Sequence, residues 1–168
     1  MRQRGSKAWC LAVLLLVAPS VHAEEKEPST FIEIGGAGEW GLRHGGFSFG
    51  PNLGVEHTII ENWLEIEAGV TPLFAKGQAE TGTDFFLKKP FELSKSLEFE
   101  AGGGVEWIHK VSGKPGDSMA GEAVVEFIYR PWQDKNFRLF LEPAYAYDFG
   151  KEHEQSLSVS GGLKIGIR

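Results

Sequence analysis

Apolar and polar residues alternate along most of the chain that follows residue 23. A period of two predicts β-strands, because successive side chains of a strand point to opposite faces. No stretch of this part of the chain shows the 3.6-residue period of an amphipathic helix. Eight strands are predicted, over Phe31–Leu42, Phe47–Glu56, Trp63–Phe74, Asp84–Leu93, Leu97–Lys110, Met119–Tyr129, Phe137–Tyr147 and Ser156–Ile167.

The length of these strands points to a membrane. They run for about 10–12 residues, whereas strands of soluble proteins usually have about five or six and a tilted strand crosses a bilayer with about 9–11. One face of each strand is apolar and free of charge, except in the fourth, where Lys89 interrupts it. Large aromatic residues lie near the strand ends, as in the interfacial girdles of membrane barrels: Trp40, Trp63, Phe74, Trp107, Phe137 and Tyr147. The predicted fold is all-β, an eight-stranded antiparallel up-and-down transmembrane β-barrel.

The predicted connections differ in length from one end of the barrel to the other. Those at residues 57–62, 94–96 and 131–136 are compact, and those near 75–83, 111–118 and 148–155 are somewhat longer. Membrane barrels have short periplasmic turns and longer outer loops. An even number of strands then places both chain ends of the barrel on the periplasmic side.

The first 23 residues have the layout of a secretory signal peptide. Basic residues at positions 2, 4 and 7 precede an apolar run from Ala8 to Pro19, and Val21 and Ala23 fit a cleavage site. The run is shorter than the roughly 20 residues of a membrane-spanning helix, although an uncleaved anchor is the alternative. The predicted organisation is a cleaved signal peptide at 1–23, a lead-in at 24–30 and the barrel at 31–168. Cleavage would remove Cys10, the one cysteine.

Composition and charge narrow the class of protein. The 168 residues are 42% hydrophobic and 24% charged, which excludes a disordered chain and a helical membrane bundle. The formal net charge of −6 argues against a nucleic-acid partner, because phosphate binding needs a basic surface. The export signal excludes a cytosolic enzyme.

The polar face of the strands is acidic and rich in small residues. If the apolar face contacts lipid, the following carboxylates point into the lumen: Glu33, Glu39, Glu56, Glu65, Glu67, Glu98, Glu100, Glu106, Glu122, Glu126 and Glu142. The cations placed to balance them are Lys88, Arg138 and Lys164. We expect a hydrated ion-pair and hydrogen-bond network that fills the lumen, because side chains fill barrels of this size. The alternatives are a narrow path for cations, or a cation held between Glu65, Glu67, Glu98 and Glu100.

An export signal before eight alternating strands, with glycine-rich stretches such as Ile34–Gly38 and Ala101–Val105, resembles the small outer-membrane β-barrels of Gram-negative bacteria. The OmpA transmembrane domain and OmpX are members of that group. The resemblance implies an outer-membrane location and a structural or surface-interaction role, such as membrane integrity, lipopolysaccharide contact or binding through loops. The implied partners are outer-membrane lipid, lipopolysaccharide and, during biogenesis, the barrel assembly machinery. We expect a monomer without a cofactor.

Two other functions are consistent with the pattern. A soluble periplasmic or secreted lipocalin-like barrel would turn the apolar face inward and bind a small apolar ligand. A lipid A hydrolase or acyltransferase would use a rim histidine, His109 or His153, as a base. The His-x-Ser pattern of lipid A deacylases is absent, so no catalytic residue is predicted. His109, His153 and Asp148 lack recognisable ligand spacing, so no metal site is predicted either.

Overall fold

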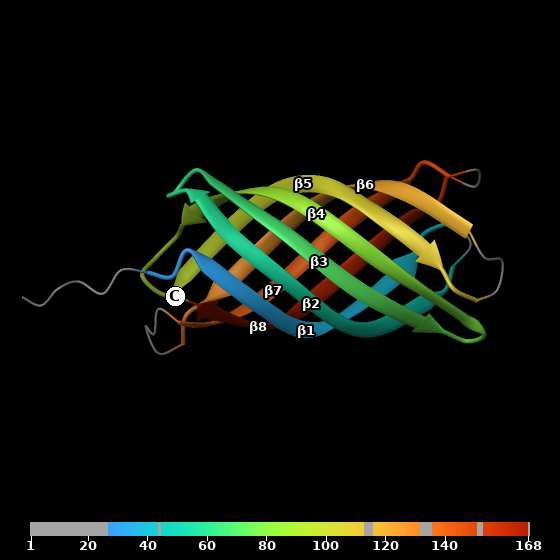
Figure 1. The fold of residues 1–168 in the computed structure, drawn as a ribbon, viewed down its shortest axis with the longest axis horizontal. Helices are drawn as coiled ribbons and strands as arrows, with labels where there is room; N and C mark the ends of the chain where they lie inside the picture. Colours follow the sequence, from blue (N-terminus) through green and yellow to red (C-terminus); the bar gives the residue numbers. More distant parts are fainter. Residues whose placement is uncertain (1–26, 44, 113–115, 132–135, 151–152, 168) are drawn as a thin grey trace, which may run out of the picture.

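Eight antiparallel strands close into a barrel in a computed structural model of the chain (Figure 1). The structure describes residues 27–43, 45–112, 116–131, 136–150 and 153–167, so the predicted signal peptide and residues 24–26 of the lead-in lie outside it. Each strand pairs with its neighbours in sequence, and β1 pairs with β8 to complete the cylinder. The strands are β1 (Thr30–Gly41), β2 (Phe47–Ile60), β3 (Leu64–Ala75), β4 (Gln78–Glu92), β5 (Leu97–Lys110), β6 (Gly116–Tyr129), β7 (Phe137–Asp148) and β8 (Gln155–Ile167). The predicted all-β, up-and-down barrel is confirmed.

The strands contain 12–15 residues, and several of them extend beyond the predicted limits. The largest difference is at β4, which begins at Gln78 instead of Asp84. Residues 78–83 lack large apolar side chains, so alternation does not reveal them as a strand. They nevertheless pair with β3 on one side, and residues 80–83 pair with β5 on the other. Inter-strand hydrogen bonding therefore extends the strand beyond its amphipathic part.

The predicted contrast between short turns and longer loops is wrong. At the end of the barrel where β1 begins and β8 ends, called the terminal end below, the connections are residues 61–63, 93–96 and 130–136. At the opposite end they are residues 42–46, 76–77, 111–115 and 149–154. The predicted loop at 75–83 is a tight turn in which Gly77 has a φ of +76°, a conformation that glycine adopts without steric cost. The longest connection thus lies at the end where compact turns are expected.

The two faces of the barrel wall have opposite character. Large apolar side chains such as Leu53, Val70 and Leu141 point outward and are exposed, whereas acidic and basic side chains are buried inside. A small apolar cluster of Phe86, Val124 and Ala144 lies among them. This orientation contradicts the alternative of a soluble barrel with an apolar interior, because that ligand cavity would need the exposed Leu, Ile and Phe residues inside.

No helix in the described ranges is long and apolar enough to cross a membrane.

Candidate functional site: the charged barrel interior

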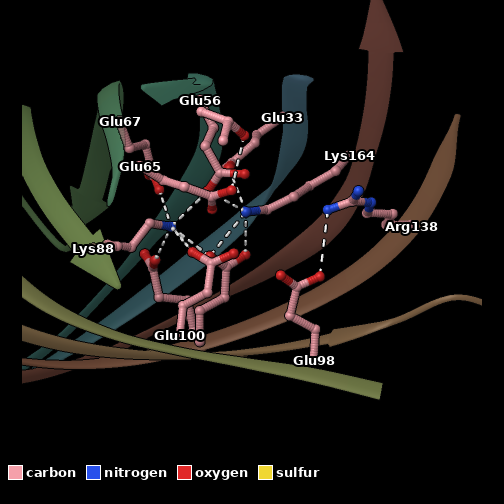
Figure 2. A network of polar contacts seen from close by, with 12 residues as sticks. Glu33, Glu56, Glu65, Glu67, Lys88, Glu98, Glu100, Arg138 and Lys164 are labelled. Atoms are coloured by element: carbon pink, nitrogen blue, oxygen red, sulfur yellow. Dashed lines mark hydrogen bonds and ion pairs between the residues drawn. The ribbon is translucent and has the colours of Figure 1, made fainter. Parts of the chain in front are cut away.

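Two buried lysines lie among carboxylates in the half of the barrel nearer the terminal end (Figure 2). Lys88 comes from β4 and Lys164 from β8, so strands far apart in sequence bring them together. Both side chains have a relative exposure of 0%. Their neighbours along each strand point outward, since the period of two places alternate residues on the inner face. Local alternation thus directs the ammonium groups inward, and closure of the sheet makes them meet the same carboxylates.

Lys88 is surrounded by carboxylates from five other strands. Its Nζ lies 3.0 Å from Glu56, 3.3 Å from Glu142 and 3.4 Å from Glu100. It also forms ion pairs with Glu67 and Glu126. Such charge-assisted contacts compensate for part of the cost of removing the ammonium group from water.

Lys164 shares two of these partners. Its Nζ lies 2.6 Å from Glu56, 2.7 Å from Glu126 and 3.0 Å from Glu33. Glu33 and Lys164 are also direct cross-strand partners in the β1–β8 ladder. Glu56 and Glu126 therefore bridge the two lysines and join them into one network that crosses the lumen.

A separate charged group lies at the terminal end of the interior. Glu98 lies 2.5 Å from Arg130 and 3.5 Å from Arg138. Glu27 lies 3.1 Å from Arg138 and 3.6 Å from Arg130. The Arg138 guanidinium also stacks on Phe31, 4.0 Å from the ring centroid. Figure 2 shows Glu98 and Arg138 beside the lysine network, with Glu98 as a distinct ion-pair partner.

The sequence prediction omitted Arg130 and Glu27 from this group. Arg130 was detectable from the alternation of β6. It lies two residues after Ile128, which is fully buried, so its side chain is on the same inner face. Glu27 precedes β1, so no strand periodicity indicates its direction. Its contact with the arginines depends on the course of the segment before β1.

The half of the barrel away from the termini contains further carboxylates and a small cavity. The cavity measures about 50 Å³, room for very few water molecules. Its charged lining residues are Glu39, Glu80, Glu106, Lys110, Asp148 and Glu154. The lumen is therefore closed by side chains at this level.

The predicted lumen residues lie on the inner side of the barrel wall but do not form one cluster. The buried members are Glu33, Glu56, Glu65, Glu67, Glu98, Glu100, Glu106, Glu126, Glu142, Lys88, Arg138 and Lys164, while Glu39 and Glu122 are half-buried. The four carboxylates proposed to hold a cation together are separated: Glu67 pairs with Lys88, and Glu98 pairs with the arginines. The groups whose ligand atoms lie within 4.8 Å of one another are Glu33–Glu56–Glu67–Glu126 and Glu56–Glu65–Glu100.

The aromatic residues predicted as girdles lie at both ends of the outer wall. Trp63 and Phe137 lie at the terminal end, and Trp40, Phe74 and Trp107 at the opposite end, all exposed. Tyr147 differs, because it is half-buried and stacks on His153 with 6.0 Å between ring centroids. Exposed aromatic rings at two levels match the places where amphipathic rings meet headgroups.

In the part of the rim that the structure describes, Ser118 does not form the serine–histidine pair that a hydrolase needs. His109 Nδ1 lies 2.5 Å from Asp117, and the neighbouring Ser118 hydroxyl donates to Asp148 at 2.9 Å. His109, His153 and Asp148 are not among the metal-competent groups found in the described residues. The Thr30 hydroxyl does contact an imidazole, His57, at 2.8 Å, but at the opposite end of the barrel.

Glycine at position 102 makes room for the lysine network. A Cβ at Gly102 would collide with the Leu87 carbonyl oxygen and lie 2.8 Å from the Lys88 Cα, so strands β4 and β5 would have to separate. We expect Gly102→Ala to lower the free energy of unfolding by about 1–3 kcal/mol, the usual cost of overpacking. Urea unfolding in detergent micelles measures this change. The matched control is Gly36→Ala, where the nearest atom lies 3.6 Å from the new methyl group; equal stability of the two variants would contradict the packing argument.

Comparison with known proteins supports the fold. No protein-family model matches the sequence, and none of the curated proteins is similar to it. Among solved structures, Neisserial surface protein A matches with a TM-score of 0.71 and 14% identity over 85% of this chain and 100% of that one. Ail, the attachment invasion locus protein of Yersinia pestis, matches with a TM-score of 0.58 and 11% identity over 84% and 100%. A designed transmembrane β-barrel matches with a TM-score of 0.53 and 12% identity over 84% and 98%.

At these identities the similarity concerns the fold alone. The chain has the architecture of the small eight-stranded outer-membrane β-barrels, and the resemblance noted from its sequence is confirmed at that level.

Proposed function

We propose that the protein is an outer-membrane β-barrel with a structural or surface-interaction role, and that it is not an enzyme. The observation that carries the proposal is that the barrel wall is apolar on the outside and charged on the inside, the reverse of a water-soluble barrel. Exposed apolar side chains surround an interior of ion-paired carboxylates, lysines and arginines. An apolar belt of this kind is stable in lipid and costly in water.

The filled interior supports a scaffold role over transport. Buried ion pairs occupy the terminal half of the lumen, and the cavity in the other half holds only about 50 Å³. A barrel closed in this way offers its outer wall and its loops for contact. The partners we propose are outer-membrane lipid and lipopolysaccharide, with the barrel assembly machinery during biogenesis, for a monomeric barrel.

Two fold neighbours carry names that fit this role. One is called a surface protein and the other an attachment invasion locus protein. Neither name describes a reaction. For this chain, the Ser118 hydroxyl donates to Asp148 and not to the adjacent His109, which gives a lipid A hydrolase or acyltransferase little support.

The test of the proposed function is cell fractionation, followed by electrophoresis of boiled and unboiled samples. We expect the protein in the outer-membrane fraction, extracted only by detergent, with a mobility that shifts on heating as the closed barrel unfolds. A soluble periplasmic protein without a heat shift would contradict the proposal.

Two matched cysteine variants test which end of the barrel faces outward. Lys76→Cys lies in the turn away from the termini and Lys95→Cys in a turn at the terminal end, and both positions are exposed. A membrane-impermeant maleimide is expected to label Lys76→Cys on intact cells, and Lys95→Cys only after the outer membrane is permeabilised. The reverse pattern would overturn the proposed orientation and the assignment of the surface loops.

A further inference from the structure

The lysine network contains more carboxylates than its ammonium groups can pair. In the described residues of this half of the barrel, Lys88 and Lys164 face a larger set of inward acids: Glu33, Glu56, Glu65, Glu67, Glu100, Glu126 and Glu142. Two positive charges cannot neutralise so many ionised carboxylates. Buried carboxylates without partners bind protons or cations instead.

Two groups of carboxylates lie close enough together to hold a metal ion, and they differ in how fully the lysines already pair with them. In the group of Glu33, Glu56, Glu67 and Glu126, every member forms an ion pair with at least one lysine. The ammonium groups therefore act as its cations. In the group of Glu56, Glu65 and Glu100, the ligand atoms also lie within 4.8 Å of one another. Here Glu56 pairs with both lysines and Glu100 lies 3.4 Å from Lys88, but among the described ion pairs neither lysine reaches Glu65.

Two members of the second group have unpartnered oxygens. Glu100 is fully buried, neither of its carboxylate oxygens accepts a hydrogen bond, and Lys88 approaches one of them only to 3.4 Å. Glu65 is 6% exposed and accepts from the Thr58 hydroxyl at 2.8 Å through Oε1, while its buried Oε2 has no partner. Orphaned acceptors at this depth are rare in folded proteins and call for an unseen partner.

We propose that Glu56, Glu65 and Glu100 bind a hard divalent cation, with Ca²⁺ as the ion that fits best. Three carboxylates offer oxygen ligands and three negative charges, which is the donor chemistry that such ions prefer. Two ligands on opposite sides of Ca²⁺ lie about 4.6–5.2 Å apart, since each Ca–O bond is about 2.3–2.6 Å. Ca²⁺ also tolerates irregular geometry, whereas Mg²⁺ requires a near-ideal octahedron.

The two lysines beside the site do not exclude the ion. Lys88 lies 3.0 Å from Glu56 and 3.4 Å from Glu100, and Lys164 lies 2.6 Å from Glu56, so part of both charges faces the proposed ligands. Each lysine has other partners: Lys88 also pairs with Glu67, Glu126 and Glu142, and Lys164 with Glu33 and Glu126. The surplus of acid is large enough to hold both the ammonium groups and a divalent ion.

Equilibrium dialysis against Ca²⁺ tests the site, using the full mature barrel in an uncharged detergent after EDTA treatment and without lipopolysaccharide. We expect about one Ca²⁺ per chain and a rise in the thermal midpoint when Ca²⁺ is added. Glu100→Gln and Glu65→Gln, each nearly isosteric, are expected to weaken Ca²⁺ binding at least tenfold and to abolish the thermal shift. A heat shift in electrophoresis confirms that each variant is folded. If one of the two variants does not fold, the other still tests the site.

The matched control is Glu106→Gln, which removes a buried inward carboxylate from the other half of the barrel. It is expected to bind Ca²⁺ as the unmodified protein does. Absence of bound Ca²⁺ in the unmodified barrel would overturn the proposal. Protonation of Glu65 and Glu100 would then explain their oxygens without partners. Undiminished binding by Glu65→Gln and Glu100→Gln would also overturn it, because the ion would then be held elsewhere. These results are independent of where the protein resides in the cell.

Discussion

Replacing Lys88 with methionine is expected to lower the free energy of unfolding by about 3–5 kcal/mol, the usual cost of removing one partner from a buried ion pair. Methionine has similar length but no charge, so the buried carboxylates of Glu56, Glu67 and Glu126 would lose a shared cation. Lys164 remains, but it already pairs with three carboxylates and cannot replace Lys88 at Glu67. Urea unfolding of the refolded barrel in micelles measures the loss.

The adjacent residue provides the control. Lys89 follows in the same strand, points outward and lies 5.4 Å from the Phe91 ring centroid. Lys89→Met removes the same charge from the exposed wall and is expected to change stability by less than about 1 kcal/mol, as for most surface substitutions. If Lys88→Met unfolds completely, Lys88→Arg retains a cation and is expected to fold. Equal stability of the two methionine variants would show that the interior carboxylates do not depend on Lys88.

Val70→Arg is expected to destabilise the barrel in lipid bilayers by about 2–4 kcal/mol, because Val70 lies at the middle of β3 on the exposed wall. An arginine at that level would have to bring water or headgroups into the hydrocarbon. In a soluble barrel the same substitution would be harmless. The measurement is reversible unfolding of the protein in liposomes.

Val111→Arg is the matched control for this position. Val111 follows β5, outside the strands, and its side chain is 60% exposed. At the interface the cost of an arginine falls to about 0–1 kcal/mol. Equal costs at positions 70 and 111 would contradict a bilayer around the middle of the wall.

The number of strands and the face of each residue were predictable because both are local properties. A strand alternates its side chains whatever it pairs with, so Glu98 and Glu100 were correctly placed on one face of β5. The same alternation would have located Arg130. It did not reveal residues 78–83 as strand, because their conformation is set by hydrogen bonds to β3 and β5 and not by an apolar face.

The partners of each charge were not predictable. Glu98 and Glu100 are two residues apart on the same face, yet Glu98 pairs with Arg130 and Arg138 whereas Glu100 lies near Lys88. The difference depends on the positions of β4, β6 and β7 across the lumen. Alternation along one strand contains no information about that arrangement.

The sequence by itself therefore determined an eight-stranded wall with one apolar and one acidic face, since both follow from a period of two repeated along the chain. Only the tertiary structure decided that Lys88 and Lys164 meet at shared carboxylates, and that Glu65 and Glu100 retain oxygens without partners. The physical reason is closure of the sheet. Pairing β1 with β8 fixes the register around the barrel, and the register decides which side chains from distant strands reach the same point in the lumen.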